Sequence, residues 1–120
     1  MKVYHRKDFM QLPEGTIYSK GKPWYFEGIS VKGETLLGED GPSDWTCLGL
    51  EWIEARNEDE QWFRLDKMLT EGVSYPMNES CGRDGCFDND DIFLVFEKED
   101  LLKVKEFVEK AIIEVKHYGN

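Results

Sequence analysis

The pattern of apolar and polar positions is clearest between residues 92 and 118. Residues 92–96 (Ile-Phe-Leu-Val-Phe) are five consecutive apolar residues, too few for a helix and rich in β-branched and aromatic side chains. They predict a central strand covered on both faces. Beyond residue 97, apolar residues recur every three or four positions, which predicts one apolar side of a long helix. These residues are Leu101, Val104, Val108, Ala111 or Ile112, Val115 and Tyr118. We expect the rest of the chain to pack on this strand and helix.

The first half of the chain shows short apolar segments separated by turn residues. We expect strands at residues 2–5, 16–19, 24–31, 34–37 and 45–53, and a helical turn at residues 7–12. In the last of these strands Leu48, Leu50 and Trp52 alternate with other residues. Because side chains alternate across a strand, these three predict its core face.

A second helix is predicted after the last of these strands. Asn57 can cap it, and Glu60 stands three residues further on, which is the spacing of a capping box. Trp62, Leu65 and Leu69 give its apolar side, and Gly72 its end. Residues 73–91 show little periodicity and are predicted to form a long loop. Loops of that length are uncommon in compact domains and often functional.

These elements predict a single α+β domain over residues 1–120. We expect a mostly antiparallel sheet of about five strands with two helices packed on it, the C-terminal helix being the longest. At 120 residues the chain is long enough to bury a core without disulfides or metal. No apolar run approaches the length that spans a bilayer, and the N-terminus lacks the apolar core of a secretory signal. A cytosolic location is expected, and the odd number of cysteines, three, fits reduced thiols.

The net charge of −10 is unevenly distributed. Residues 1–33 hold six basic and three acidic residues, a balance of +3, so the remainder carries −13. Direct binding to duplex nucleic acid is disfavoured, because that affinity comes from cations that displace counterions along the phosphates. The acidic surface either keeps the protein in solution or meets a basic partner protein, in the manner of a nucleic-acid mimic.

Several patterns that suggest metal binding or catalysis lack the spacing that this chemistry needs. Cys81 and Cys86, with His5 or His117, do not form the paired C-x2-C units of structural zinc sites. The aspartates of residues 84–91 lack the order of a calcium-binding loop, because the glycine comes first. We therefore predict no metal and no cofactor.

No catalytic residue is predicted either. Nothing in the sequence places a histidine near Ser80 or Cys81, and no nucleophile elbow is present. Residues 82–85 match the G-x-x-G pattern of RNA-binding loops, but they precede a strand in an acidic setting. We expect a protein that is not an enzyme. A small hydrolase dependent on Cys81 or Cys86 is the alternative.

The most suggestive cluster for binding combines cations with aromatic rings near the start of the chain. Aromatic faces can stack nucleobases, and cations beside them can hold phosphates. The glycines on either side of Arg83 would let its guanidinium grip a phosphate or carboxylate. The predicted ligand-binding residues are Lys20, Lys22, Trp24, Tyr25 and Arg83, with Lys32 nearby. The alternative is that Trp24 packs in the core, the lysines are scattered over the surface, and Arg83 neutralises the aspartates beside it.

Two segments resemble small uncharacterised proteins of tailed bacteriophages and prophages. The first runs from Leu12-Pro13-Glu14-Gly15-Thr16-Ile17-Tyr18 through Gly21-Lys22-Pro23-Trp24, and the second from Tyr75-Pro76-Met77-Asn78-Glu79-Ser80 to Gly85 with the strand and helix after it. The resemblance covers about half of the chain. It implies a genomic setting, that of small accessory products such as inhibitors of bacterial defence, and no catalytic residue.

These observations lead to two hypotheses on function. The first is a phage-type binding protein that counters bacterial defence in the host cytosol by sequestering a small anionic nucleotide signal. The second is an acidic inhibitor that binds a basic host protein through Glu58, Asp59 and Glu60. A symmetric assembly of identical chains would suit a sequestering protein, because many small proteins of this kind bind their ligand between protomers.

Overall fold

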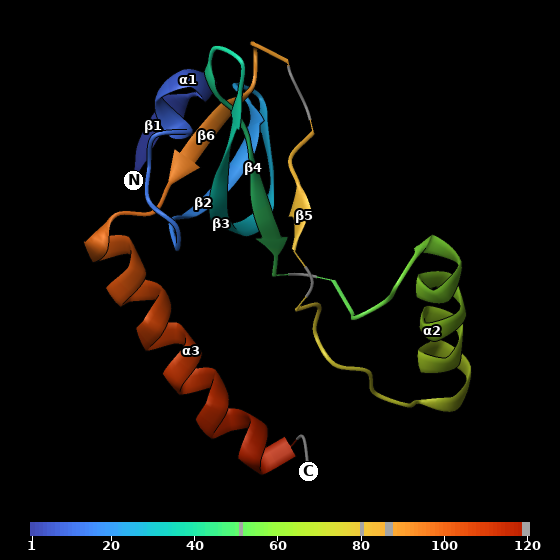
Figure 1. The fold of residues 1–120 in the computed structure, drawn as a ribbon. Coiled ribbons are helices and arrows are strands. Elements are labelled where there is room, and N and C mark those ends of the chain that lie inside the picture. The colour runs from blue at the N-terminus through green and yellow to red at the C-terminus, as the bar shows by residue number, and fades with distance from the viewer. Residues whose placement is uncertain (51, 80, 86–87, 119–120) are drawn as a thin grey trace.

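The computed structural model describes the chain except for residues 51, 80, 86, 87, 119 and 120. Figure 1 shows the arrangement of its strands and helices. In chain order they are β1 (Lys2–His5), α1 (Arg6–Phe9), β2 (Ile17–Lys22), β3 (Tyr25–Gly38), β4 (Gly41–Gly49), α2 (Glu58–Glu71), β5 (Gly82–Arg83), β6 (Ile92–Val95) and α3 (Lys98–Tyr118). The predicted α+β class is confirmed, and the C-terminal helix is the longest.

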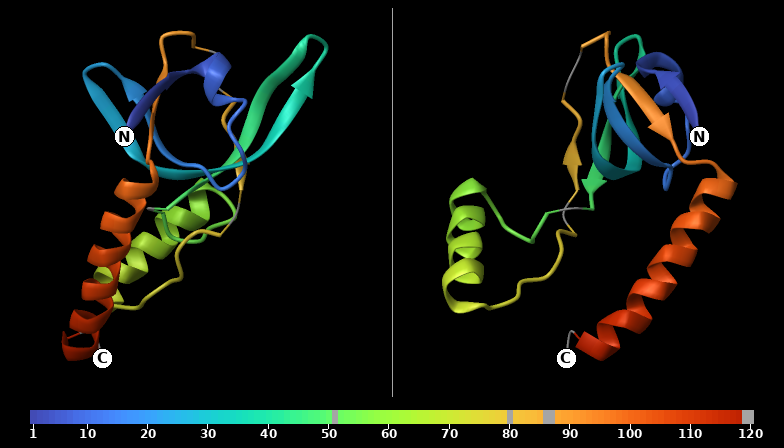
Figure 2. Two further views of the ribbon diagram at one scale, coloured as in Figure 1. Left: turned by 90° about the vertical axis from the view of Figure 1, so that its left-hand side faces the viewer. Right: turned by 180° about the vertical axis from the view of Figure 1, so that it is seen from behind.

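The six strands form one antiparallel sheet in the order β1-β6-β2-β3-β4-β5. The sheet is strongly curved (Figure 2). Although β6 comes late in the sequence, it lies between β1 and β2, so that Phe93 is opposite Tyr4 on one side and Lys20 on the other. The strand expected at residues 92–96 is therefore an interior strand of the sheet, as predicted.

The core lies on the concave face of the sheet, where four aromatic rings meet. Phe9 of α1 stacks on Phe93, with 4.4 Å between ring centroids, and lies 4.6 Å from Tyr18 and 5.0 Å from Trp45. The indole nitrogen of Trp45 donates a hydrogen bond to the Tyr18 hydroxyl over 3.1 Å. Edge and stacked aromatic contacts of this kind add to the free energy gained from burial. The short α1 thus closes the core with one side chain.

Two details of the predicted strands are wrong. The turn expected at residues 32–33 is absent, and β3 runs through it with an irregularity between Lys32 and Thr35. A Cβ at Gly33 would lie 2.2 Å from the hydroxyl of Thr46, so this glycine allows the close approach of β4. The core face predicted for the segment of β4 is also wrong, because Trp45 is buried against Phe9 whereas Trp52 is exposed.

The expectation that the two long helices pack on the sheet is wrong as well. No described residue of α2 or α3 is buried, and Figure 1 shows both helices projecting away from the sheet. Only residues 96 and 97 connect β6 to α3, so the helix continues beyond the end of the strand instead of returning along the sheet. None of the described helices has both the length and the apolar character that a membrane crossing requires.

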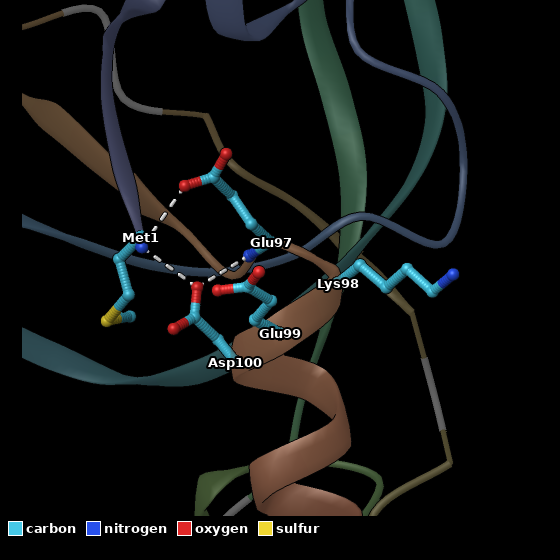
Figure 3. A pocket seen from close by; sticks show the side chains of 5 residues that line it. All are labelled: Met1, Glu97, Lys98, Glu99 and Asp100. Atoms are coloured by element: carbon cyan, nitrogen blue, oxygen red, sulfur yellow. Dashed lines mark hydrogen bonds and ion pairs between the residues drawn. The ribbon is translucent and has the colours of Figure 1, made fainter.

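The start of α3 is tied to the N-terminus of the chain (Figure 3). The amino group of Met1 lies 3.2 Å from a carboxylate oxygen of Glu97 and 2.9 Å from one of Asp100. The same Asp100 carboxylate accepts the backbone N–H of Glu97 over 2.9 Å, as residues three positions into a helix often do. These contacts raise the pKa of the terminal amine, first through the Asp100 hydrogen bond and then through that of Glu97.

Candidate functional site

Two cavities flank the hairpin of β2 and β3. The first, which we call the polar cavity, has a volume of about 220 Å³ and lies against the curved sheet. Its lining includes Tyr18, Lys20, Glu27, Ser30, Arg83 and Asp84. The second, which we call the tip cavity, has a volume of about 320 Å³ and lies at the turn of the hairpin. Its lining is more apolar and includes His5, Pro23, Trp24 and Ile92.

Strand alternation and the pairing of β5 bring the residues of the polar cavity together. Tyr18 and Lys20 are two residues apart on β2, and Ser30 lies opposite Tyr18 on β3. Arg83 comes from β5, where it is opposite Thr46 of β4. Two of the predicted cations, Lys20 and Arg83, therefore line one cavity although they are far apart in sequence.

Lys20 is held in place by buried carboxylates. Its ammonium group donates a hydrogen bond to Asp84 over 3.0 Å and lies 3.6 Å from Asp91. Asp84 is nearly buried and also receives a hydrogen bond from Arg6 over 2.8 Å. Arg6 in turn stacks over the Trp45 ring, 4.6 Å from its centroid. The cation that lines the cavity is thus oriented by contacts that continue into the core.

Arg83 is anchored on one side and open to solvent on the other. Its guanidinium group makes two contacts of 3.0 Å with Asp44, which is fully buried. The backbone N–H groups of Trp45 and Gly85 also donate to this carboxylate. Burial opposes ionisation of Asp44, but these hydrogen bonds and the charge of Arg83 outweigh it and lower the pKa of Asp44. The Arg83 side chain remains 63% exposed, so it can meet a ligand.

Lys22, the third predicted cation, is paired with two carboxylates. It donates a hydrogen bond to Asp88 and lies 2.9 Å from Asp91. The hydrogen bond that Lys22 donates to Asp88, followed by the one to Asp91, raises the pKa of Lys22. Lys22 lies between Lys20 and Trp24 in sequence, and its ion pairs connect β2 to the segment that precedes β6. The nearby Lys32 is buried, its ammonium group donates to the Thr35 hydroxyl over 2.6 Å, and burial lowers its pKa.

The predicted aromatic residues are exposed at the turn of the hairpin. Trp24 is 77% exposed and Tyr25 is 48% exposed, and their ring centroids are 6.2 Å apart. The alternative that Trp24 packs in the core is therefore wrong. Trp24 lines the tip cavity, whereas Lys20 and Arg83 line the polar cavity. The five predicted ligand-binding residues thus lie on the hairpin of β2 and β3 and on the more distant β5, and they do not surround a single cavity.

Sequence reasoning missed several residues that organise the site. Arg6 and Asp44 are far from Arg83 in sequence, and no local pattern marks them as its neighbours. The sequence also suggests that Arg83 neutralises the aspartates beside it, whereas its guanidinium group binds Asp44, 39 positions away. The signal that was available in the sequence is the cluster of basic and aromatic residues at positions 20–25.

Little in the polar cavity suggests covalent catalysis. Cys47 also lines it, and burial is the main reason that the pKa of this thiol is raised. A thiol with a raised pKa is protonated at neutral pH and is a poor nucleophile. His5 lies on the other cavity. Lys20, Arg83 and the hydroxyl groups of Tyr18 and Ser30 are suited to holding an anion with several oxygen atoms.

The structure separates the three residues of the predicted partner-binding surface. Glu60 binds Arg56 through its carboxylate over 2.8 Å, and its backbone N–H donates to the Asn57 side chain. The side-chain hydrogen bond from Arg56 is the main cause of the lowered pKa of Glu60. Glu60 is therefore part of the helix cap, as its spacing from Asn57 predicts. Glu58 and Asp59 are exposed in the first turn of α2.

The described residues form no group of three histidine, cysteine, aspartate or glutamate side chains that would suit a metal ion. Cys81 is a free, exposed thiol, and Cys86 lies outside the described residues. Comparison with protein-family models, with curated proteins and with solved structures finds no match to this chain.

Proposed function

We propose that this protein is a non-catalytic binding protein for a small anionic nucleotide. A phosphate group binds Lys20 and Arg83 at the polar cavity, and a base stacks on the exposed rings of Trp24 and Tyr25. The observation that carries the proposal is that two cations from distant strands line one cavity, next to a hairpin with an exposed aromatic tip. Aromatic stacking tolerates any base, and fixed cations select for phosphate.

The spacing of these groups favours a ligand with more than one phosphate or base. Trp24 is four positions after Lys20, which corresponds to at most roughly 13 Å of extended chain. The polar cavity, at about 220 Å³, is smaller than most sites that enclose a whole ligand, roughly 300 Å³ or more. A cyclic oligonucleotide or a cyclic ADP-ribose isomer would extend from the cavity to the rings. In the phage setting that the sequence resemblance implies, such binding would withhold a nucleotide signal from a host defence protein.

Calorimetry against cyclic oligonucleotides and cyclic ADP-ribose isomers tests the proposal. We expect tight, stoichiometric binding of at least one member of this set, and no binding throughout the set would remove the proposal. Lys20→Gln and Arg83→Gln should each weaken binding by roughly 10- to 100-fold, because each removes a charge-assisted hydrogen bond. Lys103→Gln changes the net charge equally at an exposed position on α3 and should leave the affinity unchanged.

Substitutions at Trp24 test whether a base stacks on the exposed tip of the hairpin. Trp24→Ala should weaken binding by roughly 5- to 100-fold, because one stacking platform is lost. Trp24→Phe should retain most of the affinity, since the phenylalanine ring also stacks. If Trp24→Ala binds as tightly as the wild type, the base does not lie on this ring.

A second function is favoured by the position of α2. This helix projects from the sheet (Figure 1) and presents Glu58 and Asp59 to solvent. In the second proposal, these carboxylates bind a basic host protein such as a nuclease. Binding should weaken steeply with salt and after reversal to lysine at Glu58 and Asp59. Reversal at Glu60 should also unfold the first turn of α2, because Glu60 is part of the cap.

A further inference from the structure

The described part of α3 carries an apolar stripe that no other described part of the chain covers. Leu101, Val104, Val108, Ala111 and Val115 follow one another at spacings of three, four, three and four residues, the repeat by which helices pair with other helices. Ile112 lies on the same side, and Phe107 borders it. The large apolar residues of α3 are between 36% and 60% exposed. A helix in water with such a stripe lacks a packing partner.

The helix α2 also has an exposed apolar side. Trp62, Leu65 and Leu69 lie on one side of α2, and Leu69 is 86% exposed. Together with Met68, they line an open apolar depression of about 450 Å³. Trp52, which precedes α2, is also exposed and borders a neighbouring depression with Trp62. Both long helices thus present uncovered apolar surface.

The accessible surface area of the chain can be compared with that expected for a compact monomer of the same mass. Its accessible surface area is 8874 Å², whereas a folded monomer of 14.1 kDa is expected to expose roughly 6,700 Å². The excess is roughly 2,000 Å², well above the roughly 800 Å² that each partner buries in a standard interface. The Cα radius of gyration agrees, since it is 16.8 Å against roughly 13.6 Å for a compact domain of this length.

The charges of α3 indicate what kind of molecule covers the stripe. The chain has a net charge of −10, but α3 contains five acidic residues and five lysines and is neutral apart from His117. Some of these charges pair along the helix, as in Glu106–Lys110 at 3.1 Å and Lys105–Glu109 at 3.8 Å. A strongly basic partner would find no net attraction on this helix. Two copies of α3 can approach without the repulsion that acts between other parts of the chain.

We propose that α3 packs along its apolar stripe against α3 of a second copy of this chain, and that the apolar sides of the two α2 helices cover the remaining apolar surface. The result is a helical dimer interface that carries the curved sheets on its outside. The interface is obligate in character, because its area and apolar nature match those of permanent homodimers. This proposal does not depend on the nature of the ligand.

The mass of the full chain in solution, measured by sedimentation equilibrium, tests the interface. We expect 28.2 kDa, twice the chain mass of 14.1 kDa, at micromolar concentrations. Val108→Glu should weaken self-association by roughly 100-fold or more, because it places a carboxylate in the apolar interface. Lys103→Gln changes the net charge by the same amount but lies on the opposite side of α3, so it should leave the dimer intact.

Helix content separates loss of the interface from loss of folding. Glutamate has at least the helix propensity of valine, so α3 in Val108→Glu should retain its intrinsic tendency to form a helix. If the far-UV circular dichroism of Val108→Glu nevertheless falls, Val108→Ala is a second variant. It introduces no charge, and alanine has the highest helix propensity. That variant should weaken the dimer by roughly 10-fold, because it leaves a small cavity.

A matched pair of substitutions tests the contribution of α2. Leu69→Glu lies on the apolar side and should weaken the dimer, whereas Thr70→Glu adds the same charge at the next position and should not. A wild-type protein that sediments as a monomer would overturn the proposal. So would a dimer that Val108→Glu leaves as strong as the wild type. Equal effects of the two α2 variants would remove α2 from the interface.

Discussion

The curved sheet and the two long helices differ in whether their apolar side chains are covered within the chain. In the sheet, Phe9, Tyr18, Trp45 and Phe93 bury one another within a single chain. In α2 and α3, no described residue is buried. An apolar pattern in a sequence therefore shows that a surface must be covered but does not show whether the covering residues belong to the same chain.

Replacing one ring of the sheet core should give the largest effect of the substitutions considered below. Phe93→Ala should lower the free energy of unfolding by about 3 to 5 kcal/mol, because Phe93 is fully buried and contacts three other rings. Phe63→Ala is the matched change on α2, where the ring is exposed and lies away from the apolar side. It should cost less than about 1 kcal/mol.

Urea denaturation of both variants at one fixed protein concentration provides the measurement, because self-association changes apparent stability. Similar losses at the two positions would contradict the contrast between the sheet and the helices.

The next largest effect concerns the buried charge that anchors Arg83. Asp44→Asn keeps the shape of the side chain but removes its charge, which leaves Arg6 and Arg83 without that carboxylate. Loss of one partner from a buried ion pair costs about 3 kcal/mol or more. We expect this loss at neutral pH, and we expect the Arg83 side chain to become less ordered.

The pH dependence of stability shows whether this loss is electrostatic. Because the pKa of Asp44 is lowered in the folded protein, its stabilising effect is complete above about pH 4 and is lost as the pH falls through the folded value. The difference in stability between the wild type and Asp44→Asn should therefore shrink below about pH 4. Urea midpoints across this pH range would reveal it. A difference that stays constant with pH would point to packing instead of charge.

Local patterns predicted most of the fold. The apolar run at residues 92–96, the Asn57–Glu60 spacing and Gly72 each depend on neighbours in sequence, and each appears in the structure. The failures involve distant contacts. The close approach of Gly33 to Thr46 continues β3 where a turn was predicted, and the packing of Trp45 on Phe9 selects the core face of β4.

The candidate site was predictable to a similar extent. Its cations and rings follow from the clustering of basic and aromatic residues near the start of the chain. The carboxylates that hold them do not, because Asp44 reaches Arg83 only after β5 pairs with β4, and Asp84 reaches Arg6 across 78 residues. Both Lys20 and Lys22 pair with aspartates, and the sequence could not show that Lys20 lines the polar cavity.

A smaller effect is expected at the C-terminal end of α2, which has no packing on the sheet to hold it. Gly72 ends this helix with a φ of 68°, a left-handed conformation that other residues adopt at a cost. Gly72→Ala should destabilise the end of α2 by about 1 to 2 kcal/mol. Gly82→Ala is the control, because a Cβ there also meets open space but its φ is not positive. Helix content by circular dichroism should fall in the first variant and remain unchanged in the second.

The smallest effect tests whether the N-terminal cap of α2 acts independently of the rest of the chain. The Asn57 side chain accepts the backbone N–H of Glu60 over 2.8 Å, and Asn57→Ala should lower the stability of the helix by about 1 kcal/mol. Asn57→Asp keeps an oxygen acceptor at this position and should behave like the wild type. Because α2 is separate from the sheet core, the loss in Asn57→Ala should reduce the protection of α2 amides from hydrogen exchange while leaving that of β2 and β6 unchanged. Equal loss of protection in the sheet would show that α2 and the sheet unfold as one unit, and the contrast between the two regions would then be wrong.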